Sequence, residues 1–151
     1  MFHIALWEPE IPPNTGNIAR LCAAVGARLH LIGRLGFRMD EKSVRRAGLD
    51  YWEHVDLIHH ADWNAFLAAI DGAPIWLVED PAPLTYTAAD FRDGDVLLFG
   101  NESKGLPERL LNQYAGRRIG IPMPTGKVRS LNLSNAVAVV LYEALRQTAD
   151  W

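Results

Sequence analysis

Short apolar segments alternate with amphipathic segments along almost the whole chain, and this alternation is the feature that most constrains the fold. We expect strands at His3–Trp7, Leu29–Ile32, Val55–Ile58, Ile75–Val78, Val96–Phe99 and Ile119–Ile121. We expect helices over Asn14–Val25, Asp40–Ala47, Trp63–Ile70, Pro107–Tyr114 and Leu133–Leu145. Strands that alternate with helices form a mostly parallel sheet with helices on both faces. The predicted fold class is therefore α/β.

The size of the chain fits a single domain. It has 151 residues, of which 49% are apolar, and this is enough to bury one core of ordinary size. The sequence contains no internal repeat, linker or low-complexity segment. We therefore expect one domain over residues 1–151.

The charge of the chain gives no general signal for a nucleic-acid partner. The formal net charge is −3, so any contact with RNA would have to be local. The candidates are the pairs Arg45–Arg46 and Arg117–Arg118 and the loop that holds Lys127 and Arg129. Ordinary solvated surface charge is the other interpretation of such pairs.

Several classes of protein are disfavoured by the sequence. Cys22 falls on an apolar helical stripe, which is typical of a buried residue rather than a catalytic thiol. The five histidines lack metal-ligand spacing, and Ser130 and Ser134 lack the surroundings of a hydrolase nucleophile. No segment has the pattern of a signal peptide or a membrane span. We expect no metal, no membrane partner and a cytoplasmic location.

Four polar loops follow predicted strands: Glu8–Asn17, Glu79–Pro83, Gly100–Gly105 and Pro122–Asn132. In parallel sheets, ligands bind beyond the carboxyl ends of the strands. The loop Gly100–Gly105 has the glycine spacing of a phosphate loop, but Leu106 and Pro107 stand where that loop needs lysine and a hydroxyl residue. This excludes a nucleoside triphosphate site. The glycines of this loop could still bring its backbone close to another ligand, or they could serve only a tight turn.

The entrance to the last helix carries more polar side chains than one helix cap needs. Ser130, Asn132, Ser134 and Asn135 cluster there, although a single side chain suffices to cap the first turn. The surplus suggests a binding site, and a cap and a site can coexist in the same residues.

Three segments together resemble a known set of motifs. They are Asn14–Arg20 (NTGNIAR), Leu98–Pro107 (LFGNESKGLP), and Ile121–Met123 followed by Arg129–Ala136 (RSLNLSNA). In this order and spacing they resemble the signatures of the SPOUT (SpoU-type) RNA 2′-O-methyltransferases. The likeness extends through EPEIPPNTGNIARLC and RRAGLDYWE to the TrmL-type tRNA wobble-nucleoside 2′-O-methyltransferases. It covers essentially the full chain, and we expect no appended RNA-binding domain.

The resemblance implies a fold, a cofactor and an assembly. The fold would have a C-terminal trefoil knot, whose loops hold S-adenosylmethionine mainly through backbone groups. The positions that match those loops are Val78, Gly100, Glu102, Ile121, Met123, Ser130 and Leu131. The protein would be a homodimer with its C-terminal helix in the interface. An intrachain core explains the apolar face of that helix equally well.

The resemblance also implies catalytic residues. Methyl transfer to a ribose 2′-hydroxyl depends on positioning the hydroxyl and stabilising its developing negative charge. Arg20 matches the family arginine that lies near the methyl group. Because a guanidinium stays protonated, we expect Arg20 to stabilise the alkoxide or hold a phosphate while an RNA phosphate or water takes the proton. Ser130 and Asn132 would hold the ribose.

Three further residues are candidates for binding the RNA substrate. Asn14 and Asn17 would order the first loop, with helix capping as the alternative, and Arg129 would meet an RNA phosphate. No role is assigned to the loop Pro124–Val128.

The predicted function is S-adenosylmethionine-dependent 2′-O-methylation of the wobble cytidine or uridine in tRNA anticodon loops. One alternative is a ribosomal RNA 2′-O-methyltransferase, which the short chain disfavours. The other is a catalytically silent dimeric RNA-binding module, against which the intact Arg20, Glu102 and Asn132 argue.

Overall fold

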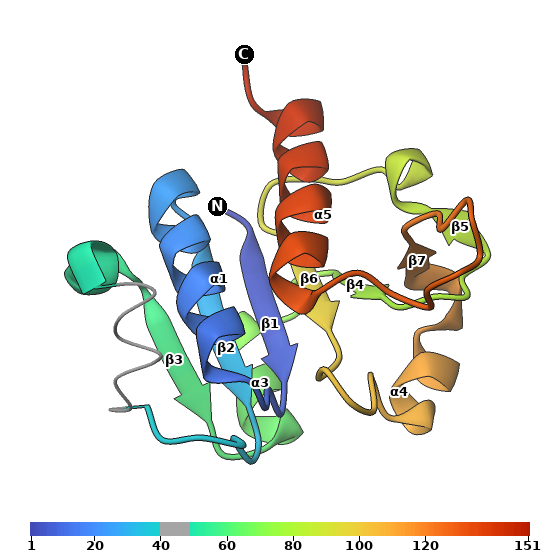
Figure 1. Ribbon diagram of the computed structural model, residues 1–151. Coiled ribbons are helices and arrows are strands. Elements are labelled where there is room, and N and C mark those ends of the chain that lie inside the picture. The colour runs from blue at the N-terminus through green and yellow to red at the C-terminus, as the bar shows by residue number, and fades with distance from the viewer. Residues whose placement is uncertain (40–48) are drawn as a thin grey trace.

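A sheet of parallel strands organises the computed structural model, which describes residues 1–39 and 49–151 (Figure 1). Within these residues the sheet has seven strands, namely β1 (His3–Trp7), β2 (Arg28–Ile32), β3 (Leu57–His60), β4 (Ile75–Val78), β5 (Leu84–Thr85), β6 (Val96–Phe99) and β7 (Arg118–Gly120). Their order is β3-β2-β1-β6-β4-β7-β5, and each neighbouring pair runs parallel. The predicted fold class is confirmed.

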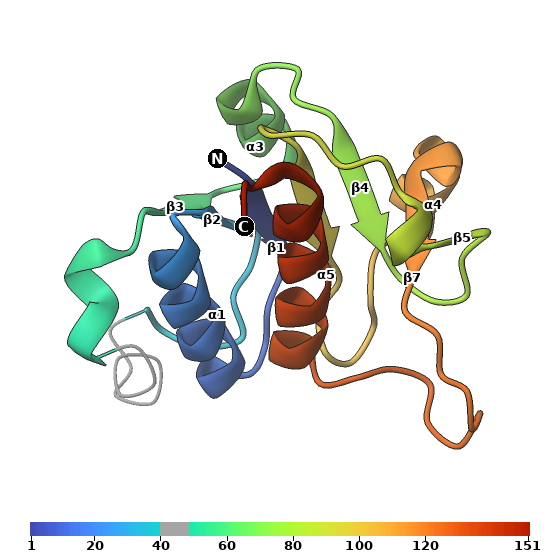
Figure 2. The same ribbon diagram turned by 90° about the horizontal axis from the view of Figure 1, so that it is seen from above.

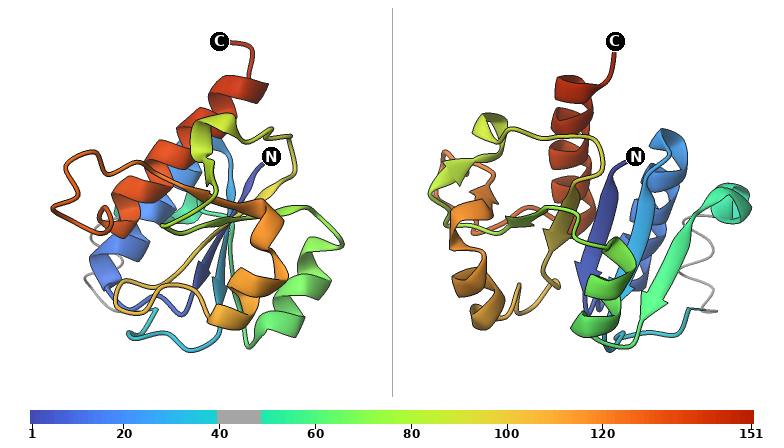
Figure 3. Two further views of the ribbon diagram at one scale, coloured as in Figure 1. Left: turned by 90° about the vertical axis from the view of Figure 1, so that its right-hand side faces the viewer. Right: turned by 180° about the vertical axis from the view of Figure 1, so that it is seen from behind.

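Helices cover both faces of this sheet. Helices α1 (Pro12–Val25) and α5 (Leu133–Thr148) lie side by side on one face (Figure 2). Helices α3 (Trp63–Ile70) and α4 (Glu108–Gln113) lie on the opposite face, which is seen from behind in Figure 3. The described part of the chain also contains three short 3₁₀ helices, η1 (Leu49–His54), η2 (Tyr86–Ala88) and η3 (Ala115–Arg117).

The strands divide their side chains between two apolar cores, because successive residues of a strand point to opposite faces. In β1, Ile4 and Leu6 belong to the core beneath α1 and α5, whereas Ala5 belongs to the core beneath α3 and α4. In β6, Phe99 and Leu98 divide in the same way. Both faces of the central strands are therefore buried, which explains their nearly continuous apolar sequences.

The apolar face of α5 is buried within its own chain. Val137, Val140, Leu141 and Ala144 have no exposed surface and pack into the core beneath α1 and α5. The periodic face of this helix is therefore an intrachain core, one of the two interpretations that the sequence allowed. The trefoil knot implied by the family resemblance stays a prediction.

Two strands are displaced from the predicted positions. β3 starts at Leu57 because the N–H of Val55 donates to the carbonyl of Trp52 and so belongs to the turn that ends η1. β7 ends before Ile121, whose N–H donates to the carboxylate of Asp80 instead of to a strand. In both cases the apolar pattern correctly predicts a strand, and the hydrogen-bond partner of the terminal residue decides where that strand starts or ends.

Other differences concern short elements and helix ends. α1 starts at Pro12 rather than Asn14, because proline is well suited to a first helical turn, where its missing N–H leaves nothing unpaired. Pro107 is the N-cap of α4 rather than its first residue. β5 has only two residues and shows no pattern in the sequence. The predicted helix Asp40–Ala47 and the pair Arg45–Arg46 lie outside the described residues.

A row of three histidines crosses the α3 face of the sheet. His30 on β2 lies 2.9 Å from His3 on β1 through its Nε2 and 2.8 Å from His60 on β3 through its Nδ1. Phe66 of α3 packs edge-on against His30 and His60. Two hydrogen bonds join the row when all three imidazoles are neutral, since each neutral ring has one N–H and one acceptor nitrogen. Burial, with the neighbouring histidines, lowers the pKa of His30 to about 3.

We predict that acid destabilises the protein through this row. In the unfolded chain His30 takes up a proton near pH 6.5, whereas in the folded protein it stays neutral, so stability is full above about pH 6.5 and falls as the pH drops. Between pH 6.5 and pH 5, His30 alone should lower the free energy of unfolding by about 2 kcal/mol. Urea unfolding at several pH values measures the effect.

The control for this prediction is an exposed histidine. His30→Gln should flatten the pH dependence of unfolding, and His54→Gln should leave it as in the wild type, because His54 is exposed at the end of η1. An unchanged pH dependence in His30→Gln would show that the row does not control acid stability.

Candidate functional site

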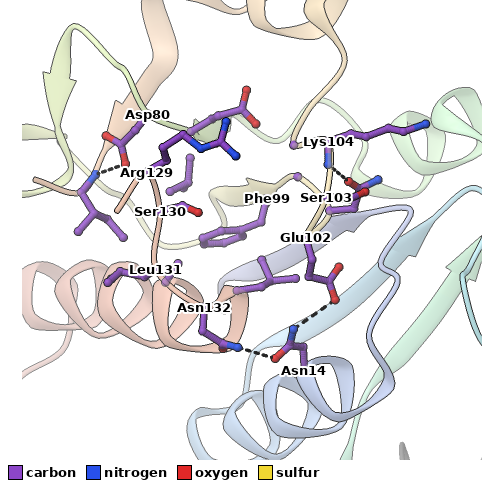
Figure 4. Close-up of a pocket in the computed structure, with 18 of the residues that line it drawn as sticks. Asn14, Asp80, Phe99, Glu102, Ser103, Lys104, Arg129, Ser130, Leu131 and Asn132 are labelled. Carbon is purple, nitrogen blue, oxygen red and sulfur yellow. Dashed lines mark hydrogen bonds between the residues drawn. The ribbon is translucent and has the colours of Figure 1, made fainter. Parts of the chain in front are cut away.

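The four polar loops meet because their strands are neighbours. β1, β6, β4 and β7 are adjacent in this order and parallel, so their carboxyl ends lie along one edge of the sheet. A cavity of about 460 Å³ lies among the loops that follow these strands (Figure 4). This volume is within the range of small-molecule binding sites.

The carboxylate of Glu102 ties the second motif to the first. Its Oε1 accepts the N–H of Glu10 at 3.0 Å, and its Oε2 accepts the N–H of Ile11 at 2.7 Å. Oε2 also accepts the side-chain amide of Asn14 at 3.2 Å. Glu102 therefore fixes the loop after β6 against the start of α1.

Asn14 continues this connection to the third motif. Its Oδ1 accepts the amide N–H of Asn132 at 3.1 Å, and Asn132 in turn caps α5 by accepting the N–H of Ser134 at 2.9 Å (Figure 4). Asn14 is only 5% exposed, so its amide cannot turn to water for partners. Each amide oxygen and nitrogen has its own partner, and a flipped amide would bring like groups together. The Glu102–Asn14–Asn132 chain thus joins all three motifs.

A second pair of hydrogen bonds joins the same two loops beside the Glu102–Asn14–Asn132 chain. The carboxylate of Glu10 accepts both the N–H and the O–H of Ser103, at 2.9 and 2.6 Å. These hydrogen bonds lower the pKa of Glu10, because they favour its charged form. Since the N–H of Glu10 also donates to Glu102, each of the two loops both donates hydrogen bonds to the other and accepts them from it.

The glycines of the loop after β6 are required by close packing. A Cβ on Gly100 would lie 2.2 Å from the backbone carbonyl carbon of Gly105 and 2.4 Å from the backbone nitrogen of Leu106. Gly105 has a φ of +69°, which a side chain rarely allows. Glycine therefore serves a tight turn here whether or not a ligand is bound.

Two acidic residues that follow β4 form another wall of the cavity. Glu79 accepts the N–H of Leu106 at 2.6 Å, and Asp80 accepts the N–H of Ile121 at 3.3 Å. Burial raises the pKa of both carboxylates. The sequence pointed to the Glu79–Pro83 loop as a polar loop after a strand, but it gave no signal for either residue.

The structure brings ten of the twelve predicted site residues to the cavity. They are Asn14, Val78, Gly100, Glu102, Ile121, Met123, Arg129, Ser130, Leu131 and Asn132. The other two, Asn17 and Arg20, lie on the exposed face of α1 and do not line the cavity. The alternative role of Asn132 as a helix cap is also real, so this residue both caps α5 and lines the site.

Residues 1–39 and 49–151 contain neither a candidate metal site nor a candidate membrane-spanning helix. Histidine, cysteine and acidic side chains there form no group of three or more that could hold a metal ion. None of the helices there is both long and apolar enough to cross a membrane.

Comparison with known proteins identifies the class of this protein. The SpoU rRNA Methylase family model matches residues 1–142. The chain therefore belongs to the SpoU methylase family, in agreement with the resemblance carried by the three motifs.

Individual relatives give a finer comparison. The tRNA (cytidine(34)-2′-O)-methyltransferase of Escherichia coli (strain K12) is 49% identical to this chain, over 97% of this chain and 94% of the relative. The protein of that name from Methylovorus glucosotrophus (strain SIP3-4) is 47% identical, over 97% of this chain and 96% of its own length.

Solved structures agree with these relatives. One, described as "Structural insights into the 2-OH methylation of C/U34 on tRNA", has a TM-score of 0.92 and 51% identity, over 97% of this chain and 95% of that chain. The SpoU methyltransferase AviRb from Streptomyces viridochromogenes, in complex with the cofactor AdoMet, has a TM-score of 0.84 and 27% identity. That match covers 96% of this chain and 59% of AviRb.

We predict that Asn14→Asp destabilises the fold. The substitution keeps the size of the side chain but replaces the amide N–H that binds Glu102 with a second carboxylate. The free energy of unfolding should fall by about 1–3 kcal/mol, the usual cost of leaving a buried polar group unpaired. Chemical denaturation measures this change. The matched control, Asn17→Asp on the exposed face of α1, should stay within about 0.5 kcal/mol of the wild type. Equal stability of the two variants would contradict a contribution of the Glu102–Asn14–Asn132 hydrogen bonds to the stability of the fold.

Proposed function

We propose that this protein transfers a methyl group from S-adenosylmethionine to the ribose 2′-oxygen of nucleotide 34, the wobble position, of tRNA. Cytidine and uridine are the proposed acceptors, and residues 1–151 act as one methyltransferase domain. The observation that carries the proposal is the cavity where the loops of all three motifs meet, joined by the Glu102–Asn14–Asn132 chain. It is supported by relatives that are 47–49% identical over nearly the whole chain and are named tRNA (cytidine(34)-2′-O)-methyltransferase.

The residues of the cavity fit S-adenosylmethionine. Apolar side chains such as Phe99 and Leu131 suit a purine ring, and the acidic wall of Glu79 and Asp80 suits a ligand that carries a positive charge. When bound, the cofactor supplies an electrophilic methyl group. We propose that the residues that hold it are Val78, Gly100, Glu102, Ile121, Met123, Ser130 and Leu131.

The mouth of the cavity suits RNA. Arg129 is exposed there, as is Lys104, and a cation at this position can bind a backbone phosphate. Ser130 and Asn132 would orient the ribose hydroxyl, and Asn14 holds the loops in place for them. Asn17, on the exposed face of α1, would contact RNA outside the cavity.

Arg20 is the proposed stabiliser of the reacting oxygen. It lies on the exposed face of α1, the helix that Asn14 anchors to the cavity, so an RNA bound outside the cavity can reach it. Its guanidinium stays protonated and cannot act as a base at neutral pH. It would stabilise the developing alkoxide or hold a phosphate, while an RNA phosphate or water accepts the proton.

We also propose that the protein acts as a homodimer through α5, in the cytoplasm where its tRNA substrate occurs. The inner face of α5 is used within the chain, so the interface would involve the outer face. Tyr142 on that face is 45% exposed and contacts the 78% exposed ring of Trp151. Sedimentation of the purified protein at twice the chain mass of 16.8 kDa would support this assembly, and sedimentation as a monomer would exclude it.

The function is tested by mass mapping of nucleosides. Purified protein, S-adenosylmethionine and tRNA should yield a single 2′-O-methyl group, at nucleotide 34. Methylation of ribosomal RNA fragments instead would identify the ribosomal RNA alternative. Absence of cofactor binding by calorimetry, together with no methylation of either RNA, would favour a silent RNA-binding module.

We predict that Arg20→Ala abolishes transfer and leaves cofactor binding intact. Loss of a charge that stabilises a developing oxyanion costs at least about 100-fold in rate. Because Arg20 does not line the cavity, the affinity for S-adenosylhomocysteine should stay within about twofold of the wild type. Transfer by Arg20→Ala at the wild-type rate would exclude Arg20 from catalysis.

A further inference from the structure

Asp80 is a carboxylate of the cavity that has an incomplete set of hydrogen bonds. It follows β4 and lines the wall opposite the loop after β6 (Figure 4). Its Oδ2 accepts the N–H of Ile121 at 3.3 Å, and within residues 1–39 and 49–151 this is the only hydrogen bond to its side chain. A carboxylate has about four acceptor positions, so most of the capacity of Asp80 is unused by the protein.

The backbone of β7 is shaped to hold this side chain. A Cβ on Gly120 would lie 2.1 Å from Oδ1 of Asp80, so any residue other than glycine would displace the carboxylate. The N–H of Ile121, the next residue, holds the other carboxylate oxygen. Gly120 therefore leaves room for the carboxylate of Asp80, and the N–H of Ile121 holds it on the wall of the cavity.

Within residues 1–39 and 49–151, no cationic side chain forms an ion pair or hydrogen bond with the carboxylate of Asp80. The positive charge of Arg118 acts on Asp80, but the Nε of Arg118 donates to the carbonyl of Glu79 at 3.1 Å. Burial raises the pKa of Asp80, and the N–H of Ile121 and the charge of Arg118 oppose that effect. A partly desolvated carboxylate gains stability from each further donor, and the open side of Asp80 is the cavity.

We propose that Asp80 accepts a hydrogen bond from the adenosine part of the ligand and so helps the cavity to select that nucleoside. Val78 and Ile121, beside Asp80 in the lining, give the apolar walls that a nucleoside needs. The donor is a neutral N–H of the purine amine or a neutral O–H of the ribose, both of which a carboxylate accepts strongly. This inference rests on the proposed use of S-adenosylmethionine.

Calorimetric binding of S-adenosylhomocysteine tests the contact. Asp80→Asn keeps the size of the side chain and an oxygen for the N–H of Ile121, and it should bind about 10- to 100-fold more weakly than the wild type. Glu108→Gln, an exposed carboxylate of α4 outside the cavity lining, should bind as the wild type does. Thermal melting checks that the variants fold, and Asp80→Ser is the replacement if Asp80→Asn does not.

Analogues of the ligand identify the donor. One carries an oxygen in place of the purine amine, and two lack either the 2′- or the 3′-hydroxyl. For the wild type, one analogue should lose about 10- to 100-fold in affinity, and for Asp80→Asn the same analogue should lose little or nothing. The analogue whose affinity loss disappears in Asp80→Asn shows whether the donor is the purine amine or a ribose hydroxyl.

Three results would overturn the inference. Equal affinity of Asp80→Asn and the wild type would remove the contact and leave the proposed function intact. An equal loss for all ligands, with the analogue penalties unchanged, would mean that Asp80 acts only by holding Ile121. Failure of the wild type to bind S-adenosylhomocysteine would overturn the proposed function and the inference with it.

Discussion

The hydrogen bonds from Glu102 to Asn14 and from Asn132 to Asn14 are the interactions on which the cavity depends. They join three loops that are far apart in the sequence through the buried amide of Asn14. Asn14 is nearly fully buried, so the loss of either neighbour leaves a polar group without water or protein to bind it. Capping of α5 by Asn132 extends the same connection into the last helix. The loops of the cavity therefore hold their positions as a group.

The negative charges of the cavity lie deeper than its positive charges. Glu79 and Asp80 form a half-buried acidic wall, whereas Lys104 and Arg129 are exposed at the mouth. A small positively charged ligand is favoured inside, and a polyanion is favoured outside. A formal net charge of −3 hides this arrangement, because the sum over a chain carries no information about where its charges lie.

Much of the candidate site could be predicted because its residues belong to motifs with fixed spacing. Gly100, Glu102 and Asn132 belong to these motifs, and all three line the cavity. Arg20 comes from the same kind of motif, yet it lies on the exposed face of α1. A motif places a residue along the chain, but the face of the helix on which it lies is decided by what that helix packs against. Asp80 belongs to no motif, and its importance emerges only from its contacts with Gly120 and Ile121.

By itself, the sequence determined the α/β class, the central strands and the buried face of α5, because each of these follows from a local periodicity of apolar side chains. Only the tertiary structure decided the strand order β1-β6-β4-β7, the two-residue strand β5 and the histidine row across β1, β2 and β3. These features arise from pairing between segments far apart along the chain. Such pairing depends on backbone hydrogen bonds, which every residue type can form, although proline can only accept them. It therefore leaves no local pattern from which it could be predicted.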